Sequence, residues 1–123
     1  MPILTDYGRN LLARALCGRN PSLPTTLYVA LGTGGGNTGI TGEPVGNGYA
    51  RQRISFTGNG GQRNTEVVRF VFNAAAGTLN HVGLYDALSG GNALAYGLLA
   101  QSAAITGPGT VTIPAEAFAV TGE

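Results

Sequence analysis

The sequence contains no lysine and no tryptophan, and it has one cysteine, Cys17, and one histidine, His81. A single cysteine excludes an internal disulfide, and it leaves no pair with the spacing of a zinc site or a redox CxxC motif. Only 11% of the residues are charged, and the net charge is +1. A basic surface that binds nucleic acid by releasing counterions is therefore not expected.

Signals for membranes and for secretion are also missing. The first residues, Met-Pro-Ile-Leu-Thr-Asp-Tyr, lack the basic and apolar stretches of a signal peptide. No apolar run has the length that spans a bilayer. We expect a soluble protein without a membrane partner, made in a cytoplasm.

What the sequence does contain is apolar side chains, which make up 43% of its 123 residues. This length predicts one domain, residues 1–123, large enough to bury a core without disulfides. With few charges, the surface must be covered largely by uncharged groups, and such a surface resists association poorly. All seven cations are arginines, which suit desolvated contacts between proteins. The composition therefore predicts a permanent partner surface.

A single helix is predicted, from Leu4 to Leu16. Thr5 or Asp6 can cap its beginning, and Gly18 ends it. Gly8 lies inside the helix and weakens the first turn unless that turn packs against something. Residues 1–20 then either cover one end of the domain or form an arm that docks on a neighbouring subunit. The arm hypothesis assigns the contact to three arginines, namely Arg9, Arg14 and Arg19.

From Thr26 onward the apolar residues recur at every second position, which is typical of strands with one buried face. Clusters of glycine and asparagine separate the strands, and no helical segment lies between them. The predicted fold is mainly β, an antiparallel β-sandwich or jelly-roll-like barrel of about seven or eight strands with one short N-terminal helix. The alternating apolar positions are Leu27, Val29 and Leu31; Ile54 and Phe56; Val68, Phe70 and Phe72; Val82 and Leu84; Val111 and Ile113; and Phe118 and Val120.

A glycine-rich stretch follows the first of these strands. Gly34, Gly36 and Gly39 match the spacing GxGxxG, but a dinucleotide site needs a helix directly after it. The next residues, Ile-Thr-Gly-Glu-Pro-Val-Gly-Asn-Gly, cannot form one. We interpret residues 32–48 as a long mobile loop.

Candidate catalytic and metal-binding residues do not cluster. His81 is expected on the polar face of its strand, because it alternates with Val82. Asp86 precedes Ala-Leu-Ser-Gly-Gly-Asn, where its carboxylate can accept hydrogen bonds from turn amides. The six acidic residues are spread along the chain. We predict no enzyme activity, no metal site and no cofactor.

The tyrosines leave three alternatives open. Tyr28 and Tyr85 are expected on outward strand faces, because apolar residues occupy the opposite side of each strand. Tyrosines on a weakly charged sheet can pack at a sheet edge, form a subunit interface or stack on a carbohydrate. We name Tyr28 and Tyr85, with the three arginines of the helix, as candidate interface residues.

Three segments carry a family resemblance, namely NGYARQRISF, NTEVVRFVF and HVGLYDALSGGNALAYGLL, at residues 47–99. Together with the opening helix and the TLYVALGTG strand, this region resembles a family of small tailed-bacteriophage virion proteins. The resemblance implies a structural protein of the virion, and it favours protein contacts over catalysis.

Size guides the choice among roles within the particle. A receptor-binding fibre normally needs a shaft or an attachment domain, and one sandwich fills this sequence. We therefore predict a capsid decoration, or cement, protein that works as a homotrimer and binds the major capsid protein. A tail-tip or tail-fibre-associated module is the first alternative, and a carbohydrate-binding host-recognition domain is the second.

Overall fold

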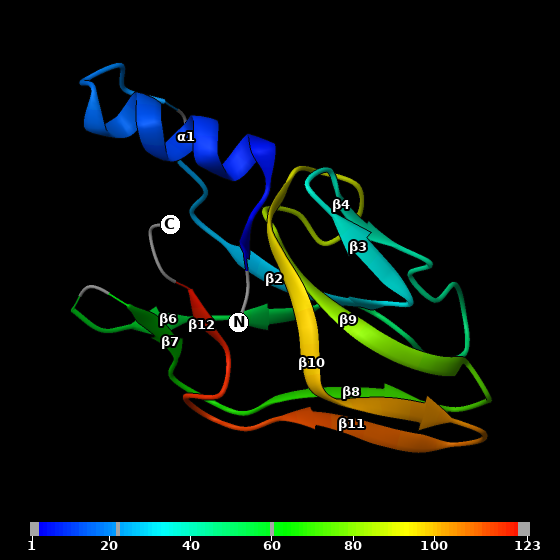
Figure 1. Cartoon of the computed structure of the whole chain (residues 1–123). Coiled ribbons are helices and arrows are strands. Elements are labelled where there is room, and N and C mark those ends of the chain that lie inside the picture. Colours follow the sequence, from blue (N-terminus) through cyan, green and yellow to red (C-terminus); the bar gives the residue numbers. More distant parts are fainter. Residues whose placement is uncertain (1–2, 22, 60, 121–123) are drawn as a thin grey trace.

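The computed structural model describes residues 3–21, 23–59 and 61–120. These residues form one helix and twelve strands, several of them only two or three residues long (Figure 1). The prediction of a mainly β, antiparallel fold with one N-terminal helix is confirmed. In chain order the elements are β1 (Ile3–Leu4), α1 (Asp6–Leu16), β2 (Leu27–Gly32), β3 (Gly34–Gly36), β4 (Gly39–Thr41), β5 (Gln52–Ile54), β6 (Phe56–Thr57), β7 (Gln62–Asn64), β8 (Val68–Phe72), β9 (Gly77–Tyr85), β10 (Ala93–Ile105), β11 (Gly109–Ile113) and β12 (Ala119–Val120).

The largest sheet has the order β1-β10-β9-β2-β5, and all of its neighbours are antiparallel. Alternation along each strand gives the sheet an inner and an outer face. Val29 pairs with Leu84, and Leu31 pairs with Val82, so these apolar side chains share the inner face. Tyr28 pairs with Tyr85 on the outer face, as predicted for both tyrosines.

The second layer consists of two small sheets, β11-β8 and β12-β7-β6. In β8, buried Val68, Phe70 and Phe72 alternate with exposed residues. Figure 1 shows β8 and β11 running across from the large sheet, with the interior between the two layers. The core cluster joins the inner face of the large sheet to β8, Ile113 and Phe118. The fold is therefore sandwich-like.

The glycine-rich segment is not a loop throughout, and the mobile-loop prediction is wrong for residues 34–41. β3 and β4 pair there as a short hairpin that folds back onto the outer face of the large sheet (Figure 1). Ile40 packs against Ala30, Tyr85 and Ala93. A Cβ on Gly83 would overlap the side chain of Ile40, so glycine at this strand position makes room for the hairpin.

Helix α1 begins and ends close to the predicted positions. The side chain of Thr5 caps it by accepting a hydrogen bond of 3.0 Å from the amide of Gly8. Gly8 is buried against the carbonyl of Leu94, where a Cβ would overlap the carbonyl oxygen. The first turn therefore covers one end of the sheet, whereas residues 13–20 are exposed. Within the described residues, no helix is long and apolar enough to cross a membrane.

Candidate functional site

The loop of residues 86–92 joins β9 to β10 and is held at the surface by side-chain hydrogen bonds. Asp86 Oδ1 accepts a hydrogen bond of 2.7 Å from the amide of Asn92, and Oδ2 accepts one of 3.1 Å from its side chain. Gly90 and Gly91 take φ values of 64° and 71°, which favour glycine. The prediction that Asp86 caps this turn is confirmed.

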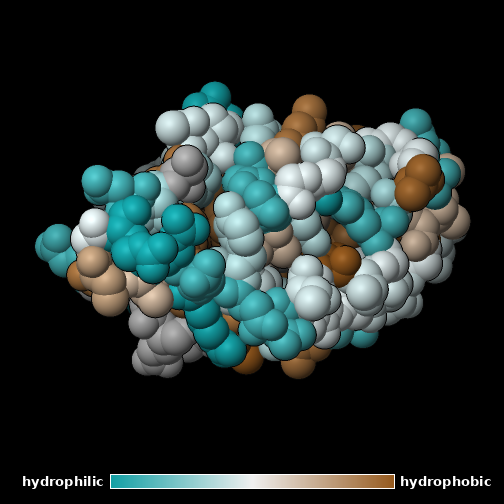
Figure 2. Space-filling view, turned by 90° about the horizontal axis from the view of Figure 1, so that it is seen from above, coloured by the Kyte–Doolittle hydropathy of each residue, from teal (hydrophilic) through white to brown (hydrophobic). Residues whose placement is uncertain are grey.

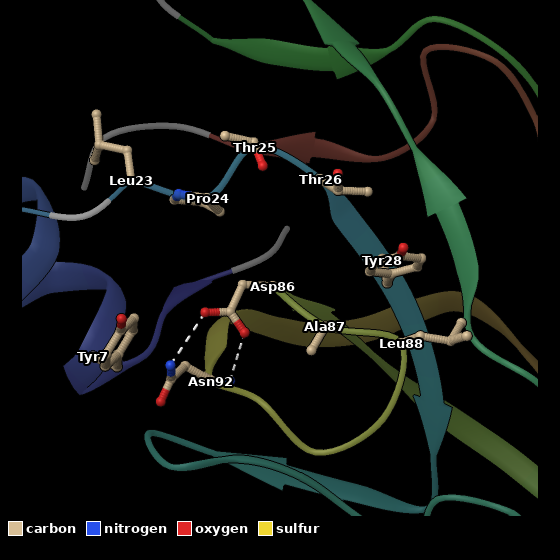
Figure 3. A pocket seen from close by; sticks show the side chains of 10 residues that line it. All are labelled: Tyr7, Leu23, Pro24, Thr25, Thr26, Tyr28, Asp86, Ala87, Leu88 and Asn92. Carbon is tan, nitrogen blue, oxygen red and sulfur yellow. Dashed lines mark hydrogen bonds between the residues drawn. The ribbon is translucent and has the colours of Figure 1, made fainter.

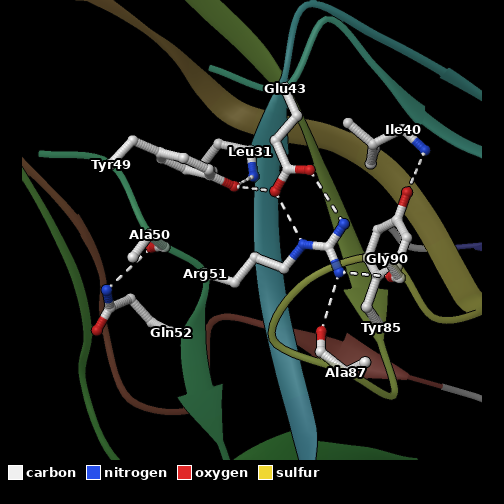
Figure 4. A network of polar contacts seen from close by, with 10 residues as sticks. All are labelled: Leu31, Ile40, Glu43, Tyr49, Ala50, Arg51, Gln52, Tyr85, Ala87 and Gly90. Atoms are coloured by element: carbon white, nitrogen blue, oxygen red, sulfur yellow. Dashed lines mark hydrogen bonds and ion pairs between the residues drawn. The ribbon is translucent and has the colours of Figure 1, made fainter. Parts of the chain in front are cut away.

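Arg51 holds the 86–92 loop from the outside (Figure 4). Its Nη1 donates to the carbonyl oxygens of Ala87 and Gly90, at 2.9 and 2.8 Å. Its Nε and Nη2 donate to the two carboxylate oxygens of Glu43, at 2.9 and 3.0 Å. Its guanidinium carbon lies 3.9 Å from the centre of the Tyr85 ring. One side chain thus joins three segments by a bidentate ion pair, two backbone contacts and a cation–π contact.

Tyr49 completes this arrangement and links it to the core. Its hydroxyl donates to Glu43 at 2.6 Å and accepts a hydrogen bond of 3.0 Å from the amide of Leu31. β5 pairs with β2 only from Leu27 to Val29, so this hydroxyl satisfies an amide beyond the paired part of the edge. The Tyr49 ring stacks on Phe70 at 6.0 Å between centroids. We call Glu43, Tyr49, Arg51 and Tyr85 the Arg51 network.

Electrostatics favour the charged pair in this network. Burial raises the pKa of Glu43, but hydrogen bonds from Arg51 and Tyr49 outweigh it, and the pKa is lowered below its ordinary value. Burial lowers the pKa of Arg51, yet the contact with Glu43 raises it on balance. Burial and the hydrogen bond to Glu43 both raise the pKa of Tyr49. At neutral pH the network therefore holds one carboxylate, one guanidinium and a neutral phenol.

Two surface hollows flank Leu88, which stands on the loop with 57% of its surface exposed. The larger, of about 520 Å³, lies among the first turn of α1, residues 23–28 and the loop (Figure 3). The smaller, of about 360 Å³, lies over the Arg51 network and residues 43–46. Val45, at its rim, is 93% exposed. The loop therefore separates two open surface depressions and exposes an apolar side chain between them.

The five predicted interface residues do not form one surface. Tyr28 is half-buried and lines the larger hollow. Tyr85 is only 9% exposed, because Arg51 lies over its ring and its hydroxyl accepts a hydrogen bond of 2.9 Å from Ile40. The ring of Tyr85 is therefore largely covered by its own chain, and a role for this residue at an interface stays a prediction. Three others, Arg9, Arg14 and Arg19, are exposed on or just after α1, and none has an ion-pair partner among the described residues.

Charged and polar side chains gather over α1. In Figure 2 they lie on the side of the helix, whereas the side of β3 and β4 is mostly of intermediate hydropathy with scattered hydrophobic residues. His81 lies on the outer sheet face, as predicted, and its Nδ1 is 2.7 Å from Asn80 Oδ1. Within the described residues, no three His, Cys, Asp or Glu side chains are grouped closely enough to hold a metal ion.

Sequence reasoning did not bring together the residues that build this site. Arg51 and Tyr49 lie in the quoted segment NGYARQRISF, but the pattern gave no partner for either. Tyr7 lies in the predicted helix segment, for which only the arginines are named as contact residues. The sequence signal that pointed to this site was Glu43, an isolated acidic residue in a weakly charged chain. A carboxylate that becomes half-buried on folding needs a nearby cation, which here is Arg51.

A comparison with known families can now be set beside this geometry. Residues 4–121 match a family described as podophage GP4 fiber I protein gp80. The chain belongs to this family. The resemblance to phage virion proteins is thereby confirmed, and the protein is a structural protein of the phage virion. No curated protein matches the chain. Two segments that carry the resemblance, residues 47–56 and 81–99, supply Tyr49, Arg51 and the 86–92 loop, and the hydrogen bonds of Arg51 join them.

Proposed function

We propose that this protein is a structural subunit associated with a podophage tail fibre. The observation that carries the proposal is the family match across residues 4–121, whose description names a fibre protein. This favours the tail-fibre alternative over the capsid-cement role that size alone had favoured. Cement activity, with the major capsid protein as partner, stays a prediction.

The distribution of charge supports an assembly role. Only one ion pair, Arg51 with Glu43, is found among the described residues, so most of the arginines face water. Three of these lie on α1 or just after it, in the same segment as Leu16, which is 79% exposed. Arginines beside an exposed apolar side chain make strong contacts once a partner excludes water. We assign the attachment to α1 and residues 17–20, with Arg9, Arg14 and Arg19 as contacts.

Self-association into a homotrimer belongs to the same proposal. It is supported by the low charge and by the exposed apolar side chains outside α1, among them Val45, Leu88 and Leu98. Light scattering on the purified protein at micromolar concentration should give three times the chain mass. A monomer at every concentration would contradict the trimer and leave the fibre role standing.

Location on the particle is tested by counting and by labelling. Quantitative mass spectrometry of purified virions should find far fewer copies than of the major capsid protein, and gold-labelled antibody should mark the tail. Hundreds of copies with label over the shell would overturn the fibre proposal and support cement. Particles without the protein should keep their heads intact and lose adsorption to the host.

The attachment residues are tested with a matched pair of variants. Changing Arg9, Arg14 and Arg19 together to Gln should leave a folded protein that no longer joins the particle. The control changes Arg53, Arg63 and Arg69 to Gln, which removes the same charge from exposed positions on the sandwich. Equal incorporation of the two variants would show that α1 is not the attachment element. Deleting the helix is a poorer test, because β1 and the first turn of α1 are built into the large sheet.

A further inference from the structure

The larger hollow combines features that suit a ligand rather than a packing defect. Its volume of about 520 Å³ is within the range of small-molecule sites. Figure 3 shows Tyr7, from α1, and Tyr28, from β2, on opposite sides of it, with Asp86 between them. Tyr7 is 41% exposed, so its ring is available to a molecule from solvent.

The chemistry of the lining selects the class of ligand. Hydroxyl groups come from both tyrosines and from Thr25 and Thr26, and Asn92 adds an amide. Asp86 is the one charged residue of the lining, and there is no cation, so phosphates and carboxylates are disfavoured. A neutral polyhydroxylated ligand fits, because aromatic rings receive its C–H faces while the carboxylate and amide bond its hydroxyls.

The polar groups are held in place before any ligand arrives. Asn92 fixes both carboxylate oxygens of Asp86, and each oxygen retains acceptor capacity. Arg51 fixes the loop through the carbonyls of Ala87 and Gly90. Little conformational entropy is therefore lost when this surface binds, and affinity is gained for that reason.

We propose that this hollow is a binding site for one or two units of a neutral saccharide. In this proposal Tyr7 and Tyr28 receive the sugar rings, and Asp86 and Asn92 bond neighbouring hydroxyls. A protein segment suits the site less well, because most of the lining is polar and the exposed apolar groups, Leu23 and Leu88, are confined to two positions. The site does not depend on where the protein sits in the virion.

The probe is a panel of neutral mono- and disaccharides built from glucose, galactose, mannose, rhamnose and N-acetylglucosamine. Each is titrated into the ¹⁵N-labelled full-length protein while backbone amide signals are followed by NMR. At least one member should shift the amides of residue 7 and of the ranges 25–28 and 86–92, with a dissociation constant of about 0.1–10 mM. A panel in which no member shifts these amides overturns the proposal.

Variants separate the site from general surface effects. Tyr7→Ala and Asp86→Asn should each weaken binding about tenfold while the remaining spectrum is unchanged. Asp86→Asn keeps a side-chain oxygen that can accept the hydrogen bond from the backbone amide of Asn92, so the turn should still form. Leu16→Ala, on the same helix but outside the hollow, should bind like the wild type. Equal affinity in all four proteins, or shifts of these amides that follow protein concentration without sugar, would assign the hollow to something other than saccharide.

Discussion

Replacing Arg51 with Gln is the sharpest test of the Arg51 network. The substitution removes two hydrogen bonds to the loop, the bidentate pair with Glu43 and the contact with the Tyr85 ring. The Arg51 side chain is 8% exposed and that of Glu43 is 27% exposed, so water can re-solvate the orphaned carboxylate only in part.

The expected loss of stability follows from this burial. Removing one partner of a fully buried pair destabilises a protein by about 3–5 kcal/mol. Partial exposure of Glu43 moves the expectation to the low end, about 3 kcal/mol in the free energy of unfolding. With a urea m value of about 2 kcal/mol/M for a chain of this size, the midpoint should fall by about 1.5 M.

Arg53 supplies the matched control, because it is exposed on β5, two residues from Arg51, and has no ion-pair partner among the described residues. Arg53→Gln should change stability by less than about 0.5 kcal/mol. Urea titrations followed by circular dichroism measure both variants. Hydrogen exchange should also accelerate in residues 86–92 of Arg51→Gln alone. Equal midpoints for the two variants would refute the claim that this network holds the loop.

Three further predictions use the same unfolding assay. Gly8→Ala should destabilise the protein by about 1–3 kcal/mol although alanine has the better helix propensity, because the new Cβ would overlap the Leu94 carbonyl. The control Asn10→Ala, at an exposed position of the same helix, should be neutral or stabilising. A Gly8→Ala variant as stable as the wild type would refute the close packing. Asn64→Ala should lower the free energy of unfolding by about 3 kcal/mol or more, because this fully buried side chain donates hydrogen bonds to two backbone carbonyls and accepts one from a backbone amide. A loss below about 1 kcal/mol would contradict that role. The third prediction concerns Glu43, whose pKa is lowered in the folded state, so the charged carboxylate stabilises the protein fully above the ordinary pKa of 4.5 and this stabilisation disappears as the pH falls through the folded-state pKa. The difference in unfolding free energy between wild type and Glu43→Gln should therefore shrink in that acid range. A difference that does not depend on pH would contradict this.

Local patterns were enough to predict several parts of the fold. The period of two placed Val29 and Leu31 on one face and Tyr28 on the other, because successive side chains in any strand point in opposite directions. The helix cap, predicted at Thr5 or Asp6 and found at Thr5, and the turn cap of Asp86 were also predictable, because each bonds amides within a few residues. These interactions are short in sequence, so they can be recognised without knowing the rest of the fold.

The β3–β4 hairpin could not be predicted in this way. Its strands are mostly glycine, so they carry no alternation of apolar and polar residues. What holds the hairpin is the fit of Ile40 against Gly83 and Gly32, which have no side chain to fill that space. The contact with Gly83 joins residues more than forty positions apart in the chain, so no local pattern reveals it.

The sequence by itself determined that this protein is an antiparallel β domain with one capped helix and a phage virion pattern. The tertiary structure alone decided that Tyr85 is buried beneath Arg51, and that Tyr7, Tyr28 and Asp86 surround one hollow. The physical reason is that strand alternation fixes which face a side chain takes but not what covers that face. Covering depends on which distant segments pack together, and their packing depends on burial and pairing across the whole chain.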